Sequence, residues 1–136
     1  MFQGFIDILD MMQRTFMGYN FILRLVDPVH RYGFAMVLHN IGAAELRTGL
    51  GRVLSLTRVQ PHTIYYNSKT SFVCDISNEH ESIELIESNH SSLMKIECSL
   101  YKKQLHKWID AYNNNWVRGA VLVQAVVNAI PVEQPL

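Results

Sequence analysis

The side chains best suited to chemistry in this sequence are its histidines and cysteines, because they ligate metal ions and act as bases or nucleophiles. They are spread along the chain as His30, His39, His62, His80, His90 and His106, with Cys74 and Cys98. No two stand at the Cys-x-x-Cys or His-x3-His spacing of a zinc site. The sequence therefore predicts neither a metal site nor a cofactor. A metal site could form only if folding brought Cys74, His80, His90 and Cys98 together.

A thiol nucleophile is the other chemistry that the sequence offers. Cys74 stands beside Asp75, and a histidine brought near it would lower the pKa of its thiol. However, no glycine occurs between Gly51 and Gly119, and loops that cradle an anion with backbone amides usually need glycine. Both cysteines alternate with apolar neighbours, which is typical of buried, inert thiols. The sequence indicates no catalytic residue, and a small thiol-dependent enzyme is the third hypothesis for function.

Charge is balanced overall but distributed in blocks. Twelve basic and twelve acidic side chains cancel, which excludes a polycation. Residues 14–58 and 102–118 are locally basic, whereas residues 75–97 are acidic. Such a dipolar surface steers charged partners. The second hypothesis is therefore a small nucleic-acid-binding protein that uses the basic residues around 47–58 and 102–118, namely Arg47, Arg52, Arg58, Lys102, Lys103 and Lys107.

Composition predicts a folded chain inside the cell. The 136 residues are 49% hydrophobic and 18% charged, against roughly 25% charged in typical globular domains, which excludes a disordered tail. This length predicts one domain over residues 1–136. Asp7 and Asp10 interrupt the apolar N-terminus and no basic region precedes it, unlike a signal peptide. No uncharged run reaches the roughly 18 apolar residues of a membrane span. We expect a cytoplasmic or nuclear protein with reduced thiols and no membrane span.

Hydrophobic periodicity predicts the elements that must position these residues. Residues 2–17 have apolar side chains at helical spacing and predict an amphipathic helix. Residues 21–26 form a short extended run. Apolar alternation and turn residues predict further strands over residues 63–66, 71–76, 82–87 and 93–100. Residues 105–112 and 116–130 predict helices, and Asn113–Asn115 either kink or separate them.

This order predicts an α+β fold. It consists of an N-terminal helix, an antiparallel sheet of about four to six short strands, and a long C-terminal helical segment packed on the sheet. In residues 93–100 the alternation places Met94, Ile96 and Cys98 on the inner face of that sheet, with Lys95 and Glu97 outside.

The two ends of the chain are more apolar than solvated helices should be, and this predicts a contact with another protein chain. The residues expected at that contact are Phe5, Leu9, Phe16, Trp116 and Val123. The first hypothesis is therefore a non-catalytic interaction module, an adaptor or complex subunit. It either associates with a second copy of itself or joins a hetero-complex.

Overall fold

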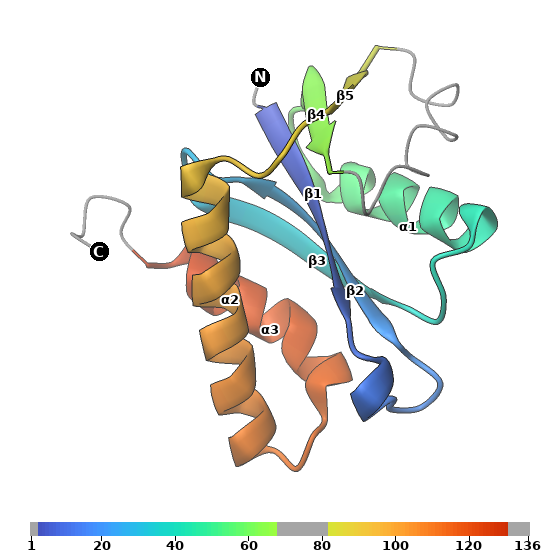
Figure 1. Cartoon of the computed structure of the whole chain (residues 1–136), viewed down its shortest axis with the longest axis vertical. Helices are drawn as coiled ribbons and strands as arrows, with labels where there is room; N and C mark the ends of the chain where they lie inside the picture. Colours follow the sequence, from blue (N-terminus) through green and yellow to red (C-terminus); the bar gives the residue numbers. More distant parts are fainter. Residues whose placement is uncertain (1–2, 68–81, 131–136) are drawn as a thin grey trace.

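A five-stranded mixed sheet with helices on both faces forms the centre of the chain (Figure 1). The computed structural model describes residues 3–67 and 82–130. In chain order the elements are β1 (Gln3–Asp10), a short 3-10 helix (Met12–Arg14), β2 (Phe21–Asp27), β3 (Tyr32–Leu38), α1 (Ala43–Leu56), β4 (Thr63–Tyr66), β5 (Glu84–Glu87), α2 (Ser92–Ala111) and α3 (Trp116–Asn128).

The strand order in the sheet is β3-β2-β1-β4-β5, so the first strand of the chain lies at its centre. β1, β2 and β3 form an antiparallel meander. Helix α1 then carries the chain back across the sheet, and β4 consequently pairs with β1 in parallel. β5 pairs in parallel with β4. The prediction of a purely antiparallel sheet is therefore wrong, because a helix and not a turn connects β3 to β4.

The predicted N-terminal helix is also wrong, because strands come first in the chain. Residues 3–10 form β1, in which Phe5, Ile6, Asp7 and Leu9 are all buried. A central strand with helices on both faces has no solvent face, so its apolar residues do not alternate with polar ones. The apolar residues of this segment are consequently as consistent with one face of a helix as with a strand that is buried on both faces.

Two further segments that alternate in sequence are helical in the structure. Helix α1 includes residues 52–56, and its buried side chains recur at helical spacing from Leu46 to Leu54. Helix α2 includes residues 93–100, where a strand was predicted. The hydroxyl of Ser91 accepts a hydrogen bond from the backbone of Met94 and caps its start. The predicted strand over 71–76 lies outside the described residues, whereas 63–66 is β4 as predicted.

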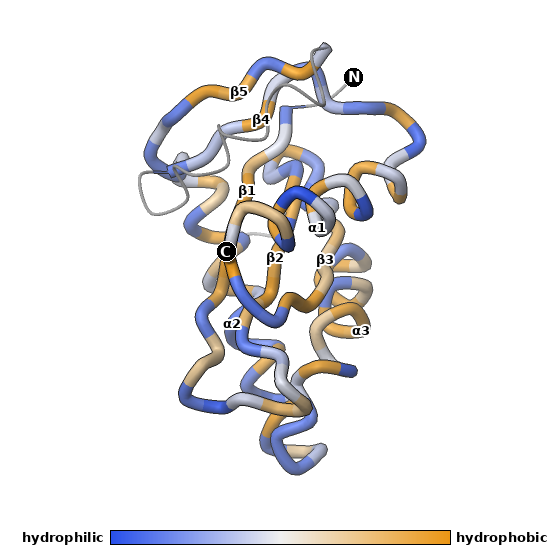
Figure 2. The backbone as a smooth tube through the Cα atoms, turned by 90° about the vertical axis from the view of Figure 1, so that its right-hand side faces the viewer, coloured by the Kyte–Doolittle hydropathy of each residue, from blue (hydrophilic) through white to orange (hydrophobic). Residues whose placement is uncertain are grey.

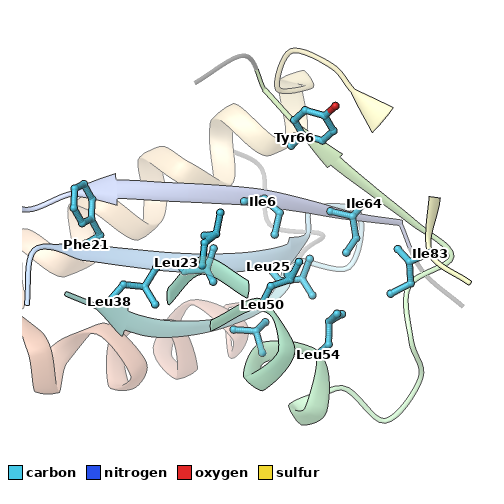
Figure 3. Close-up of a cluster of buried hydrophobic side chains, with 12 residues drawn as sticks. Ile6, Phe21, Leu23, Leu25, Leu38, Leu50, Leu54, Ile64, Tyr66 and Ile83 are labelled. Atoms are coloured by element: carbon cyan, nitrogen blue, oxygen red, sulfur yellow. The ribbon is translucent and has the colours of Figure 1, made fainter. Parts of the chain in front are cut away.

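The alternation of β2 divides the core into two layers. Leu23 and Leu25 face α1 (Figure 3), whereas Ile22, Arg24 and Val26 face α2 and α3. All seven residues of β2 are buried. Arg24 is thus a charged side chain at the centre of an otherwise apolar layer, and it needs partners from the helices above it.

A turn divides the C-terminal helical segment into two helices instead of kinking it. Asn113 and Asn114 have φ angles of 54° and 66°, in the left-handed region that asparagine tolerates better than most residues. Helix α2 therefore ends at Ala111, and α3 begins at Trp116 and packs beside it. Over residues 3–67 and 82–130, no helix is both long and apolar enough to cross a membrane.

The helical structure of residues 93–100 changes what a substitution at Ile96 should do. Ile96 is 39% exposed on α2, whereas Met94, on the inner face of the same helix, is fully buried. We expect Ile96→Ala to lower the free energy of unfolding by no more than about 1 kcal/mol. The matched variant Met94→Ala should lower it by about 2–5 kcal/mol in the same urea titration. Equal losses in the two variants would contradict the placement of Ile96 outside the core.

Candidate functional site

Arg24 is the centre of a buried polar cluster between the sheet and the two C-terminal helices. Its guanidinium donates to Asp7 Oδ2 of β1 from Nε at 3.1 Å and from Nη2 at 2.8 Å. It also donates to both carboxylate oxygens of Glu97 on α2, at 2.7 and 2.9 Å. Arg24 is completely buried, and the side chains of Asp7 and Glu97 are 11% and 2% exposed. This is a bidentate ion-pair network, the geometry in which arginine binds carboxylates most strongly.

Helices α2 and α3 complete the cluster with neutral groups. Gln124 Oε1 accepts a 3.1 Å hydrogen bond from Nη1 of Arg24. The ring of Tyr101 lies under the guanidinium carbon at 4.0 Å, and its hydroxyl donates to the backbone oxygen of Ala120. No buried side-chain nitrogen or oxygen in the described part of the chain lacks a hydrogen-bond partner. The cluster is therefore fully satisfied as it stands.

The electrostatic setting of the cluster holds Arg24, Cys98 and Tyr101 in their protonated forms. Burial would lower the pKa of Arg24, but the charges of Asp7 and Glu97 raise it above its usual value. Burial, together with Asp7, raises the pKa of the Cys98 thiol to about 12. Burial likewise raises the pKa of Tyr101. Cys98 is buried as predicted and stays protonated at neutral pH, whereas Cys74 lies outside the described residues.

Two open hollows lie beside the cluster, along the side of α2 next to β1. The first, of about 500 Å³, is lined in part by Asn67, His90, Lys95, Ser99 and Lys102. The second, of about 590 Å³, is lined in part by Arg14, Lys102 and His106. Lys102 and Asp7 line both hollows, and Asp7 also pairs with Arg24. Together the two hollows make what we call the β1–α2 strip, whose charged lining residues are Arg14, Lys95 and Lys102 with Asp7 and Asp10.

Neither the cluster nor the strip is arranged to hold a metal ion. The described residues contain no group of three or more histidine, cysteine, aspartate or glutamate side chains placed to share one. Asp7 and Glu97 are suitable oxygen ligands, but the guanidinium of Arg24 fills the space between them. In the strip, Asp7 faces lysines, which repel cations.

Most of the residues predicted to contact a partner lie inside the chain's own core. Phe5, Leu9, Trp116 and Val123 are between 0% and 9% exposed, and Phe16 packs partly buried against the same layer. These side chains pack against residues of the sheet and of α2. Phe5, Leu9, Trp116 and Val123 are therefore not presented at the surface of the folded chain, and Phe16 is presented only in part.

The surface of α3 is nevertheless apolar, because the helix is oriented with its polar residues inward. Gln124 bonds Arg24, and Asn128 bonds both the backbone nitrogen and oxygen of Gly33 on β3. Arg118 is exposed near the start of α3, and the exposed residues that follow it, up to the C-cap, are all apolar: Val121, Leu122, Ala125, Val126 and Ala129. We call these five residues the α3 outer face. Figure 2 shows the hydrophobic colouring that runs through this helix.

The structure separates the predicted basic residues into two groups. Arg47 and Arg52 lie on α1, and Arg58 follows that helix, over one face of the sheet. Lys102, Lys103 and Lys107 lie on α2, over the opposite face. The two groups therefore do not form one surface, and only Lys102 lines the β1–α2 strip.

Sequence reasoning missed Asp7, Arg24, Glu97 and Gln124. One signal for them was available, because Arg24 is the sole charged residue in the apolar run from Phe21 to Val26. A charge inside a strand that is buried on both faces requires a partner. The identity of that partner was not readable, because Glu97 is 73 residues away in the sequence.

Comparison with known proteins gives a fold but no family. No protein-family model matches the chain, and no curated protein matches it. The arrangement is similar to a crystal structure of the catalytic core domain of BIV integrase, with a TM-score of 0.62 and 11% sequence identity. That match covers 98% of this chain and 86% of the other. At this identity, the likeness shows that the two chains share a fold.

Proposed function

We propose that this chain is a non-catalytic interaction module that pairs with a second copy of itself through the α3 outer face. The observation that carries the proposal is the inward orientation of Gln124 and Asn128, which leaves only apolar side chains exposed on α3 beyond Arg118. Val121, Leu122 and Val126 are 54%, 44% and 51% exposed. Burial of these three side chains is the largest gain in hydrophobic free energy available to α3.

The shape and charge of this region support a second copy as the partner. A two-fold interface brings the same patch together from both copies, so charges in it would face each other. The five residues of the α3 outer face carry none, and the exposed charge on this helix, Arg118, lies one turn before them. Ala125 and Ala129 permit close approach of two helices. Beside Val126 lies a hollow of about 210 Å³, lined in part by Trp108, Tyr112 and Lys107, which can receive a side chain from the other copy.

The test is the molar mass of the purified chain by size-exclusion chromatography with light scattering. We expect a dimer for the wild type and a monomer for Leu122→Glu, because a buried carboxylate without a partner strongly opposes association. Leu56→Glu is the matched control. It makes the same change at a leucine that is 59% exposed on α1, and it should leave the dimer intact.

Two results would contradict this proposal. A wild-type chain that is monomeric at high micromolar concentration would leave the α3 outer face without its proposed partner. A dimer that persists in Leu122→Glu but is lost in Leu56→Glu would move the interface to α1. Circular dichroism of each variant checks that the fold is intact.

A second candidate function is nucleic-acid binding on the β1–α2 strip. Lys95, Lys102 and Arg14 line two hollows along α2, and such cations can pair with the phosphates of a nucleic-acid backbone. Asp7, the carboxylate that lines both hollows, is paired with Arg24. The strip is therefore proposed to bind a nucleic-acid backbone and not to catalyse a reaction on it.

Charge reversal of Lys102 tests this second candidate. We expect Lys102→Glu to weaken binding of a fluorescent oligonucleotide about tenfold or more and to reduce the slope of log K against log salt by about one. Arg52→Glu is the control, because Arg52 is exposed on the other side of the sheet. Wild-type affinity that does not change with salt, or equal losses in both variants, would exclude the strip as a phosphate-binding surface.

A further inference from the structure

We infer that two copies of the chain pair through α3 in antiparallel orientation, with Arg118 of each copy against the C-terminal end of α3 in the other. The inference rests on the dimer proposed above and adds to it the orientation of the partner helix. Two observations carry it. The exposed residues of α3 are spaced symmetrically from end to end, and the one charged residue of the helix, Arg118, lies at one end of them.

The exposed residues of α3 and its C-cap form a stripe along one side of the helix. They are Arg118, Val121, Leu122, Ala125, Val126 and Ala129, at intervals of three, one, three, one and three residues. Residues three and four apart lie on the same face of a helix, so the stripe is continuous. The intervals read the same in both directions. A two-fold axis across the middle of the stripe, between the levels of Val123 and Gln124, therefore superimposes the stripes of two antiparallel helices.

Antiparallel pairing also matches the sizes of the facing side chains. Leu122 of one copy comes opposite Ala125 of the other, so that a large side chain meets a small one. Val121 comes opposite Val126, and the hollow of about 210 Å³ beside Val126 lies next to this contact. Both contacts are therefore apolar on each side.

The charge of Arg118 distinguishes the two possible orientations. Arg118 lies in the first turn of α3, where the helix dipole disfavours a cation, and it forms no ion pair with another residue of 3–67 or 82–130. Antiparallel pairing places it opposite Ala129, at the C-terminal end of the other α3, where the dipole favours a cation. The last turn of α3 contains no basic residue that would already occupy this position. A parallel pair would instead bring two Arg118 guanidinium groups together, and like charges repel.

The sign of a charge effect tests the orientation. In an antiparallel dimer, Arg118→Gln removes a favourable charge from both ends of the interface, so we expect the dissociation constant of the dimer to rise about three- to thirtyfold. In a parallel dimer the same variant removes a repulsion, and the dissociation constant would fall. Analytical ultracentrifugation at low salt measures this constant, because salt screens both effects. Arg52→Gln, at an exposed arginine on α1, is the matched control and should leave it unchanged.

Cysteine cross-linking measures the orientation directly. Arg118 and Ala129 are eleven residues apart, which is about 16 Å along a helix. In an antiparallel dimer, Arg118→Cys refolded together with Ala129→Cys should form a disulfide between the copies on oxidation. Either variant alone should not, because its two cysteines lie too far apart. Cys74→Ser and Cys98→Ala in both chains remove the natural thiols. A parallel dimer gives the reverse pattern, with a cross-link in each variant alone.

The possible outcomes separate this inference from the proposed dimer. A wild-type chain that is monomeric contradicts the dimer, and the orientation with it. A wild-type dimer that Leu122→Glu dissociates, but that Arg118→Gln leaves unchanged or tightens, overturns the orientation alone. So does a cross-link in Arg118→Cys or Ala129→Cys alone that exceeds the cross-link in their mixture.

Discussion

Arg24→Met should lower the free energy of unfolding by about 3–5 kcal/mol, because it leaves the carboxylates of Asp7 and Glu97 buried without their cation. Methionine has a similar length and fills most of the space, so lost packing contributes little to this effect. Urea unfolding followed by circular dichroism measures the loss. Protein concentration must be equal for all variants, because self-association would add its own stabilisation.

A triple variant separates the charge effect from packing. Arg24→Met combined with Asp7→Val and Glu97→Leu replaces the whole buried ion network by apolar side chains. Such replacements are often neutral or stabilising, so most of the lost stability should return. A triple variant that is less stable than Arg24→Met alone would show that the contribution of these residues is not mainly the pairing of buried charges.

Trp116→Ala should lower the free energy of unfolding by about 3–5 kcal/mol as well, through a cavity. Trp116 is fully buried at the start of α3, in the layer that contains Leu9, Tyr101 and Ile109. Its indole nitrogen also donates to the backbone oxygen of Arg14. Circular dichroism is the suitable signal, because removal of a tryptophan changes the fluorescence of the chain itself.

Trp116→Phe divides this effect into its two parts. Phenylalanine keeps much of the ring but not the donor to the part-buried oxygen of Arg14, so its loss should be about 1–3 kcal/mol, roughly half that of alanine. The position was expected at an interface from the sequence. If Trp116→Ala kept the urea midpoint of the wild type but no longer formed a dimer, Trp116 would belong to an interface and not to the core.

Segments with one dominant environment could be predicted from sequence. Residues 63–66 are rich in β-branched and aromatic side chains, and they form β4 at the predicted bounds. The failures lie where two patterns coincide. Met94, Ile96 and Cys98 alternate as in a strand, but Met94, Cys98, Tyr101 and Leu105 continue as a helical stripe into residues that were already expected to be helical. That continuity is the signal that should have decided the assignment.

The candidate sites were predictable in part. The apolar character of residues 116–130 predicted a contact surface on this segment, but Val123 was selected, whereas Val121, Leu122 and Val126 are the exposed residues. The usual rule turns polar residues toward water. It fails here because Gln124 satisfies a buried arginine that lies 100 residues earlier in the sequence, a tertiary demand that local periodicity does not contain.

The wide spacing of the Arg24 partners along the chain also bears on how the molecule assembles. β1, β2 and β3 are neighbours in sequence and can pair early, and Asp7 and Arg24 come together in that step. Glu97 and Gln124 arrive only with α2 and α3. Until then, any other apolar segment that covers this face of β1, β2 and β3 would bury Arg24 without supplying a second carboxylate or an amide. Such burial of an incompletely paired charge is unfavourable. We therefore expect incorrectly docked intermediates to be short-lived. Arg24 would in this way select the correct docking of α2 and α3 during folding.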